Sequence, residues 1–381
     1  MGKIRVRRAI FPAAYYGANS IYQGYISLYY THLGFASGQI GTIGAAAAAA
    51  TLLAQPLWGR LGDRIQKRRL LLCALCLCAA AALPLALLKG SFGMQLMMAM
   101  FFYGFFCALL PLGDTILLEA GREGFGAYRL AGGVSFALAG LIFGAARSRI
   151  APGGTLWWAA ASLLLAAGAA LLLPDTAHED TRRGGVLPLL KNGWLMAMLG
   201  FILPLQMTMG FFYTFYAPHF KALGGSDSML GLGYLLATAS EIPYLLFSGR
   251  IYQKFGAAKP MCLAACLLAL RWLLLGLAQS PAAALLTQLL HGGGFIVISV
   301  SMALWIAEHV PGDLRAGGQA LLNMVTFGLA RIPGNLLGGW IAGNWGRGRA
   351  FLLCAGICAA AAAVFALCVR RKVELLSHRG A

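Results

Sequence analysis

The sequence predicts an all-α membrane protein with twelve transmembrane helices, arranged as two six-helix halves. Three observations predict this class. Hydrophobic residues make up 60% of the 381 residues, and the mean hydropathy is +0.74. Charged residues make up only 11%, against about 25% in an average soluble protein. Because apolar stretches also follow one another along the whole chain, a soluble enzyme, a disordered protein and a secreted disulfide scaffold are excluded.

Each predicted span contains about 20 or more mainly apolar residues, the length that a helix needs to cross a hydrocarbon core about 30 Å thick. Short connections with Gly, Pro or charged residues separate the spans. The basic N-terminus leads into the first span without a cleavage pattern, so we expect a retained helix and no signal peptide. The predicted spans cover residues 9–32, 38–59, 70–88, 92–118, 127–147, 153–174, 195–220, 228–249, 259–279, 282–307, 317–342 and 350–369.

The longest polar stretch lies near the middle of the chain and separates six predicted spans from six. We therefore predict an N-terminal half at residues 1–174, a cytoplasmic linker at 175–190 and a C-terminal half at 191–381. All nine cysteines lie in apolar stretches, where cysteine acts as a small hydrophobic residue. We expect neither a disulfide nor a metal site.

The basic residues predict the orientation of the chain. The 30 Lys and Arg exceed the 12 Asp and Glu, which gives a formal net charge of +18. With both termini in the cytoplasm, 21 basic residues fall in cytoplasmic segments, six in external loops and three within spans. Because cytoplasmic loops are enriched in Lys and Arg, this distribution predicts cytoplasmic termini. We expect a monomeric multi-pass protein in the lipid bilayer of the cell's inner membrane, with no nucleic-acid partner.

The two halves share short sequence patterns. Residues 59–69 at the end of the second span resemble residues 249–259 at the end of the eighth. Residues 129–133 at the start of the fifth span resemble residues 315–318 at the start of the eleventh. Duplicated halves favour a central site at their interface and alternating access by rocking of one half against the other.

Several of these segments carry a family resemblance. Gly59-x-x-x-Asp63-Arg64-x-x-Lys67-Arg68 resembles the loop signature of the major facilitator superfamily, with Gln66 where that signature has Gly. Other stretches resemble the branch that contains lactose permease and phenylpropionate permease: Gln39-Ile40-Gly41, Pro56-Leu57-Trp58-Gly59, Ser240-Glu241-Ile242-Pro243, Phe247-Ser248-Gly249-Arg250, Arg271-Trp272 and Gln288-Leu289-Leu290-His291-Gly292. The resemblance implies the major facilitator fold and proton-coupled transport of a small molecule, but it does not specify the substrate.

Asp114 and Arg129 are the first pair of charged residues within predicted spans. A charge at the middle of a bilayer costs at least about 2.5–3.5 kcal/mol, so each one needs a partner or a purpose. The two residues lie on consecutive spans joined by a short turn, and we expect them to pair, either as a structural ion pair or as a substrate-binding pair. By resemblance, they match an acid and an arginine that bind sugar in lactose permease, although aspartate replaces the longer glutamate.

Glu241, Arg271 and His291 lie on the eighth, ninth and tenth predicted spans. A carboxylate, a guanidinium and an imidazole on neighbouring helices form a titratable cluster that suits proton coupling. His291 alone would fit a hydrogen-bonded packing residue equally well. Lactose permease carries its proton on a glutamate one turn after this histidine, where this chain has a glycine run, so Glu241, Asp114 or His291 has to hold the proton here.

Polar residues on the first span predict the lining of a cavity. Tyr15, Asn19, Tyr22 and Gln23 share one helical face, which is a poor lipid contact. Further predicted substrate contacts are Gln206, Tyr213, Trp272, Gln288 and Asn323. Arg331 is left open, either as an anion site or as a partner for a carboxylate. Glu119 is expected at the cytoplasmic surface, in contact with solvent.

The signature loop predicts a cytoplasmic gate formed by Gly59, Asp63, Arg64 and Arg250. Asp63 can accept hydrogen bonds from backbone N–H groups at the start of a facing helix, and Arg64 can pair with an acid. Such contacts would hold the halves together in the outward-open state.

Together these features predict a proton-coupled importer of a small organic solute, such as an aromatic carboxylate or a sugar, with the proton as the coupling ion and no other cofactor. The alternative is a proton antiporter that exports drugs or metabolites, but that class predicts an acid deep in the first span, where none occurs. An enzyme is disfavoured because no nucleophile, metal or nucleotide motif is present.

Overall fold

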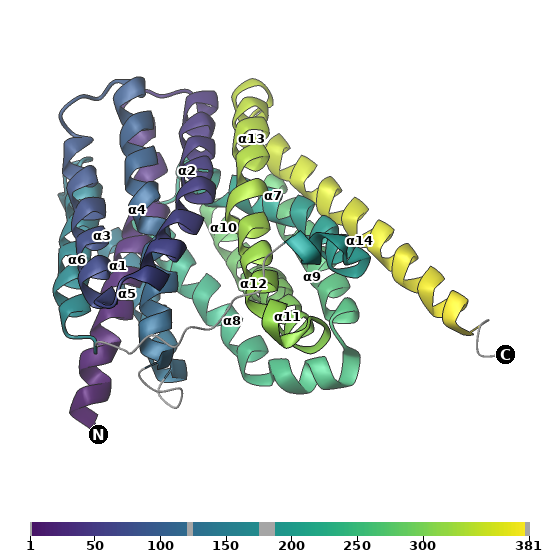
Figure 1. Cartoon of the computed structure of the whole chain (residues 1–381). Helices are drawn as coiled ribbons and strands as arrows, with labels where there is room; N and C mark the ends of the chain where they lie inside the picture. Colours follow the sequence, from purple (N-terminus) through teal and green to yellow (C-terminus); the bar gives the residue numbers. More distant parts are fainter. Residues whose placement is uncertain (1, 120–124, 175–186, 378–381) are drawn as a thin grey trace.

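The computed structural model describes residues 2–119, 125–174 and 187–377, and the regular structure in these ranges is helical (Figure 1). The helices of the first half pack as a bundle in which α1 contacts α5 and α6, while α4 contacts α2 and α3. Their bounds are α1 Gly2–His32, α2 Ser37–Arg64, α3 Arg68–Leu85, α4 Phe92–Glu119, α5 Phe125–Ala146, the 3₁₀ turn η2 Arg147–Arg149 and α6 Gly154–Leu171.

The second half contains two helical segments with irregular turns inside them. One runs through α10 Pro281–Leu286, the 3₁₀ turn η4 Thr287–Leu290 and α11 His291–His309. The other runs through α12 Arg315–Asn323, the π-helical turn η6 Met324–Leu329 and α13 Arg331–Trp345. The remaining elements are η3 Leu187–Lys191, α7 Gly193–Ala222, α8 Asp227–Phe255, α9 Ala258–Leu277, η5 Gly312–Leu314 and α14 Arg347–Ser377.

Helical segments occupy all twelve predicted ranges, and in the described residues ten of them are long and apolar enough to cross a membrane. The predicted spans 9–32 and 317–342 do not meet this criterion. The first carries many tyrosines and amides, and the second is divided by the π-helical turn. An all-helical membrane fold is therefore observed, and the count of twelve crossings stays a prediction.

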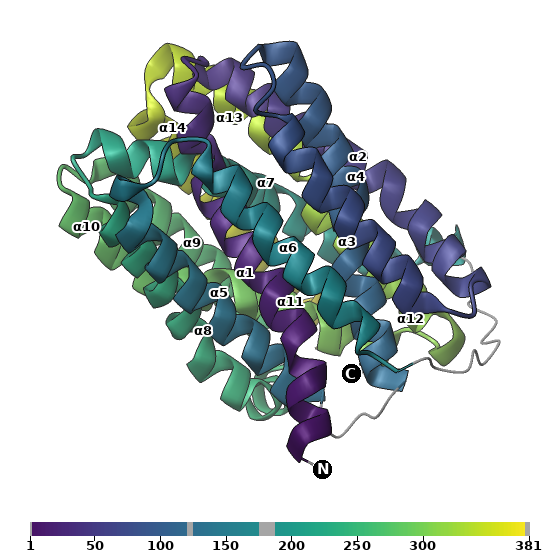
Figure 2. The same cartoon turned by 90° about the vertical axis from the view of Figure 1, so that its left-hand side faces the viewer.

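The two halves contact each other mainly through two helix pairs, α2 with α13 and α5 with α8. Figure 1 shows α2 and α13 side by side at the top of the molecule, and Figure 2 shows α5 between α1 and α8. The start of α2 meets the end of α13, and the start of α8 meets the end of α5. Tyr25, toward the end of α1, donates to the Gly140 carbonyl oxygen at the second contact, and α2 begins directly after α1, so both contacts lie at the same end of the bundle. We call this the closed end.

Glycines bring the helix backbones together at the closed end. A Cβ atom at Gly41 on α2 would collide with the backbone of Asn335 and Gly339 on α13. A Cβ atom at Gly231 on α8 would lie 2.6 Å from the carbonyl oxygen of Gly140 on α5. The Tyr234 hydroxyl on α8 then donates a 2.8 Å hydrogen bond to the carbonyl oxygen of Gly24 on α1. Small residues thus permit a backbone approach that larger side chains would prevent.

At the opposite end, which we call the open end, glycines of the interface helices have no such neighbours. A Cβ atom at Gly59 on α2, at Gly126 on α5 or at Gly249 on α8 would meet no atom within 4 Å. The halves are therefore joined at one end of the bundle and separate toward the other.

We predict that Gly41→Leu disfavours the closed end. Overpacking costs about 1–3 kcal/mol, which corresponds to a fall of about 5- to 150-fold in the population of this arrangement. The reporter is Cys107 on α4, which faces the space between the halves, in a variant with the other eight cysteines replaced by serine. Its labelling by a membrane-impermeant maleimide should become faster from the closed-end side of the membrane.

The matched control is Gly38→Leu, one turn earlier on α2, where a Cβ atom meets nothing within 4 Å. Equal labelling rates in the two variants would contradict a steric role for Gly41.

Candidate functional site

A cavity of about 540 Å³ lies between the two halves. Its walls come from α1, α2, α4 and α5 on one side and from α7, α8, η4, α11, α12, η6 and α13 on the other. This volume falls within the range of about 300–1,000 Å³ that is usual for small-molecule sites. Its aromatic side chains are Tyr15, Tyr16, Tyr103, Phe106, Phe136, Phe212, Tyr213, Tyr216, Tyr234, Phe295 and Phe327.

Asp114 and Arg129 form an ion pair in the wall of the first half. Nη1 of Arg129 lies 2.9 Å from Oδ2 of Asp114, so the predicted pairing of α4 with α5 is present. The guanidinium also lies over the ring of Tyr16, 5.6 Å from its centre. The side chains of Arg129 and Asp114 are 44% and 23% exposed, so this pair is not sealed within the protein.

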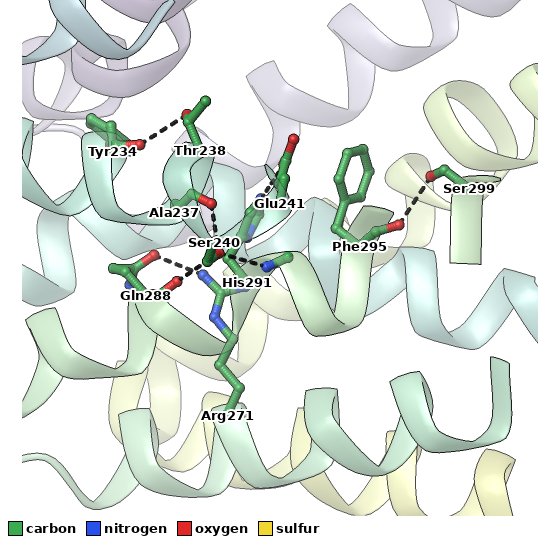
Figure 3. A network of polar contacts seen from close by, with 11 residues as sticks. Tyr234, Ala237, Thr238, Ser240, Glu241, Arg271, Gln288, His291, Phe295 and Ser299 are labelled. Atoms are coloured by element: carbon green, nitrogen blue, oxygen red, sulfur yellow. Dashed lines mark hydrogen bonds and ion pairs between the residues drawn. The ribbon is translucent and has the colours of Figure 1, made fainter. Parts of the chain in front are cut away.

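Glu241 and His291 form a second pair in the wall of the other half (Figure 3). Nε2 of His291 lies 3.4 Å from Oε1 of Glu241. The imidazole is buried against the ring of Phe295, with the ring centres 5.7 Å apart. Among the described residues, its Nδ1 atom has no hydrogen-bond partner. This pair joins α8 to α11 and presents the carboxylate to the cavity.

Arg271 does not belong to this pair, although the sequence predicted one cluster of three residues. Its guanidinium is fully buried and donates from Nη2 to Oε1 of Gln288 at 2.8 Å. It also lies over the rings of Phe212 and Trp272, at 4.2 and 4.7 Å. Because α9 packs behind η4 and α11, Gln288 separates Arg271 from the cavity.

Ser240 on α8 replaces part of the helical hydrogen bonding of the α10–η4–α11 segment. Its Oγ accepts from the N–H of Gly292 at 2.8 Å and donates to the carbonyl oxygen of Ala237 at 2.6 Å. In a regular α-helix the Gly292 N–H would bond to the carbonyl of Gln288, which here lies 3.4 Å from the same hydroxyl. A Cβ atom at Gly292 would collide with the Ser240 backbone, so this glycine permits the insertion.

The structure places most predicted binding residues in the cavity but not all of them. The cavity wall includes Asp114, Arg129, Tyr15, Asn19, Gln23, Tyr213, Gln288, Asn323, Glu241 and His291. Three predicted substrate contacts lie outside it. Tyr22 packs on Phe102 and borders a smaller cavity of about 70 Å³. Gln206 is buried within the second half, and the indole N–H of Trp272 donates to Thr208 at 3.0 Å.

Some lining residues were not predicted. Tyr103 and Phe106 precede Asp114 on α4 at helical spacing, so a search of the Asp114 face would have found them. Tyr234 and Phe327 carried no comparable signal, because aromatic residues are common throughout this apolar chain. Arg331, whose role the sequence left open, lines both the large and the small cavity.

The predicted gate residues lie at the open end. Gly59, Arg64 and Arg250 are exposed, and the side chain of Asp63 lies outside the described part of the structure.

Beside the gate, Arg68, which belongs to the loop signature but was not among the predicted gate residues, is buried. It donates from Nε to the carbonyl oxygen of Gly62 at 2.9 Å, and its Nη1 pairs with Oε1 of Glu119 at 2.5 Å. Glu119, which was expected only to contact solvent, thus joins the end of α4 to the start of α3.

Comparisons with known proteins agree with this architecture. A family model described as "MFS_1 like family" matches residues 8–353. Maltose permease of Geobacillus stearothermophilus is 28% identical, over 91% of this chain and 90% of that protein. The uncharacterized transporter YwbF of Bacillus subtilis is 24% identical, over 90% and 88%.

Solved structures share the fold at lower identity. A mutant of the nucleoside transporter NupG gives a TM-score of 0.86 with 17% identity, over 96% of this chain and 99% of that one. A bacterial homologue of the human lysosomal transporter Spinster, in an inward-facing and unoccupied conformation, gives 0.77 with 13% identity, over 98% of each chain.

We predict that Ser240→Ala lowers the stability of the protein. Removal of the hydroxyl leaves the Gly292 N–H without this acceptor, at a cost of about 1–3 kcal/mol. The apparent Tm of the purified protein should fall accordingly. Ser248→Ala, on the same helix, is the control, because that hydroxyl donates to the Leu245 carbonyl of its own helix at 3.1 Å. Similar Tm values for the two variants would show that the hydrogen bond between Ser240 and Gly292 does not stabilise the protein.

Proposed function

The chain belongs to the MFS_1 like family and is a multi-pass membrane transporter, and from this premise we propose that it couples proton entry to the uptake of a small organic solute. The solute is of the class of an aromatic carboxylate or a sugar. The observation that carries this proposal is the 540 Å³ cavity between the halves, with one acid–base pair in each wall. We further propose twelve crossings of the inner membrane, with both termini in the cytoplasm.

The closed and open ends support transport by alternating access. If the termini are cytoplasmic, as the 21 basic residues in cytoplasmic segments indicate, the closed end at the start of α2 faces outward. The present arrangement is then the inward-open one. Rocking of the halves about the cavity would close the end that carries the gate residues and expose the same cavity to the outside.

The two pairs in the cavity walls support proton coupling. Glu241 lies beside a histidine, the side chain whose charge changes most readily near neutral pH. Its carboxylate is 21% exposed, so it exchanges protons with the compartment to which the cavity opens. Asp114, paired with Arg129, is the acid in the other wall. We assign the proton to Glu241 with His291, and substrate binding to Asp114 with Arg129.

The cavity surface supports an organic substrate with a flat or ring-shaped body. Aromatic rings from both halves provide faces for such a body, and Asn19, Gln23, Gln288 and Asn323 provide hydrogen-bonding groups. Among the proteins that this chain resembles, one is named a maltose permease and one a nucleoside transporter. Both names fit a ring-containing solute.

Uptake into proteoliposomes tests this function directly. Purified protein is reconstituted and given maltose, uridine or 3-phenylpropionate while a dye reports the external pH. We expect at least one probe to enter with external alkalinisation. Glu241→Gln should reduce this proton movement at least about tenfold, because an amide cannot carry the proton.

Glu308→Gln is the control, since Glu308 lies away from the cavity and accepts a hydrogen bond from Tyr252. Uptake without any pH change would eliminate symport. External acidification during uptake would instead indicate the antiport alternative.

A further inference from the structure

One guanidinium in the cavity, that of Arg331, has no ion-pair partner in the described part of the chain. The charged side chains in its walls are Asp114, Arg129, Glu241 and Arg331, together with the titratable His291. Asp114 pairs with Arg129, and Glu241 pairs with His291. The guanidinium of Arg331 makes no hydrogen bond or ion pair with any described residue. The buried Arg271 behind the wall adds a second cation, which bonds to an uncharged amide.

Arg331 is held in place by packing of its stem and by two aromatic rings next to its guanidinium. The stem packs on Gly210 of α7, where a Cβ atom would lie 3.3 Å from Cγ of Arg331. The guanidinium lies over the rings of Tyr213 and Phe327, at 5.0 and 5.2 Å. Phe327 belongs to the π-helical turn η6 directly before Arg331, and such turns often occur at functional sites. Aromatic contacts cover the flat faces of a guanidinium and leave its N–H edge available for an anion.

The position of Arg331 connects both halves and both cavities. Five residues line both the 540 Å³ cavity and the 70 Å³ cavity. Three come from the first half, Gln23, Thr51 and Tyr103, and two from the second, Tyr213 and Phe327. Arg331 borders both cavities as well. An anion at the N–H edge of Arg331 therefore lies in the same region as Gln23, Thr51 and Tyr103, which are hydrogen-bond donors from the first half. Such a ligand contacts the two halves at once.

A charged side chain without an ion-pair partner is costly within a membrane protein and marks a functional position. We propose that Arg331 binds the carboxylate of the transported solute, and that the solute is a monoanionic organic acid whose body lies on the aromatic walls. A single guanidinium with no neighbouring lysine matches one carboxylate better than a doubly charged phosphate. This inference rests on the proposed transport function and narrows its substrate class from a sugar or an acid to an acid.

Binding to the purified full-length protein tests the charge requirement with matched probes. Benzoate and 3-phenylpropionate are compared with benzamide and 3-phenylpropanamide, their uncharged counterparts, by thermal-shift titration. Maltose, uridine and phenyl phosphate complete the set. We expect stabilisation by at least one carboxylate and at least about tenfold weaker binding of its amide, as expected for the loss of a charged hydrogen bond.

Variants at position 331 test whether the preference for a charged ligand depends on Arg331. Arg331→Gln should weaken carboxylate binding about 10- to 100-fold and abolish the preference over the amide. Arg331→Lys should weaken carboxylate binding but keep the preference for the carboxylate over the amide. A purely structural role of Arg331 would not produce this retained preference. Arg349→Gln, an exposed arginine outside the cavity, should bind like the unaltered protein. If Arg331→Gln does not fold, the preference retained by Arg331→Lys decides the assignment.

Equal binding of acid and amide, binding of maltose, uridine or phenyl phosphate in place of the carboxylates, or no carboxylate binding would overturn this inference. Proton-coupled uptake of maltose or uridine would overturn it while leaving the proposed symport intact. Carboxylate uptake without proton movement would remove symport and leave the role of Arg331 standing.

Discussion

The low polarity of the membrane interior is the constraint on which the rest of this structure depends. A charge or a backbone N–H group in that environment needs a partner from the protein itself, because lipid chains offer none. The helices satisfy most of the backbone, and Ser240 satisfies Gly292 where the helix is irregular. The same requirement explains why Asp114 lies against Arg129 and Glu241 against His291. Arg331 lacks such a partner among the described residues, and this exception points to a ligand.

Packing between the halves follows a different rule, because it has to be tight and also reversible. Gly41 and Gly231 bring helix backbones into direct contact at the closed end. Contacts of this kind depend on shape and gain little from the exclusion of lipid. Such an interface can open without leaving a buried charge unpaired, since none of the described ion pairs joins the two halves.

The sequence predicted the helical architecture well, because twelve apolar stretches with short polar connections leave few alternatives. It also predicted the Asp114–Arg129 pair, since consecutive helices joined by a short turn lie side by side. It did not place Arg271 and Trp272 correctly relative to the cavity. Their helix α9 is apolar on all sides, so no polar face indicates which side chains point inward. The insertion of Ser240 depends on the approach of two helices, which local sequence does not encode.

Each acid–base pair is contained within one half, and this has a consequence for the order of events during transport. A rigid-body rotation of the halves leaves the 2.9 Å and 3.4 Å separations unchanged, so motion does not pull a proton from its site by breaking a pair. In the proposed alternating-access cycle hydration would change instead, because the same carboxylate would be wetted by one aqueous compartment and then by the other. In that proposed cycle, the wetting compartment would supply or accept the proton, and a solute that touches both walls would be the element that the rotation itself can sense.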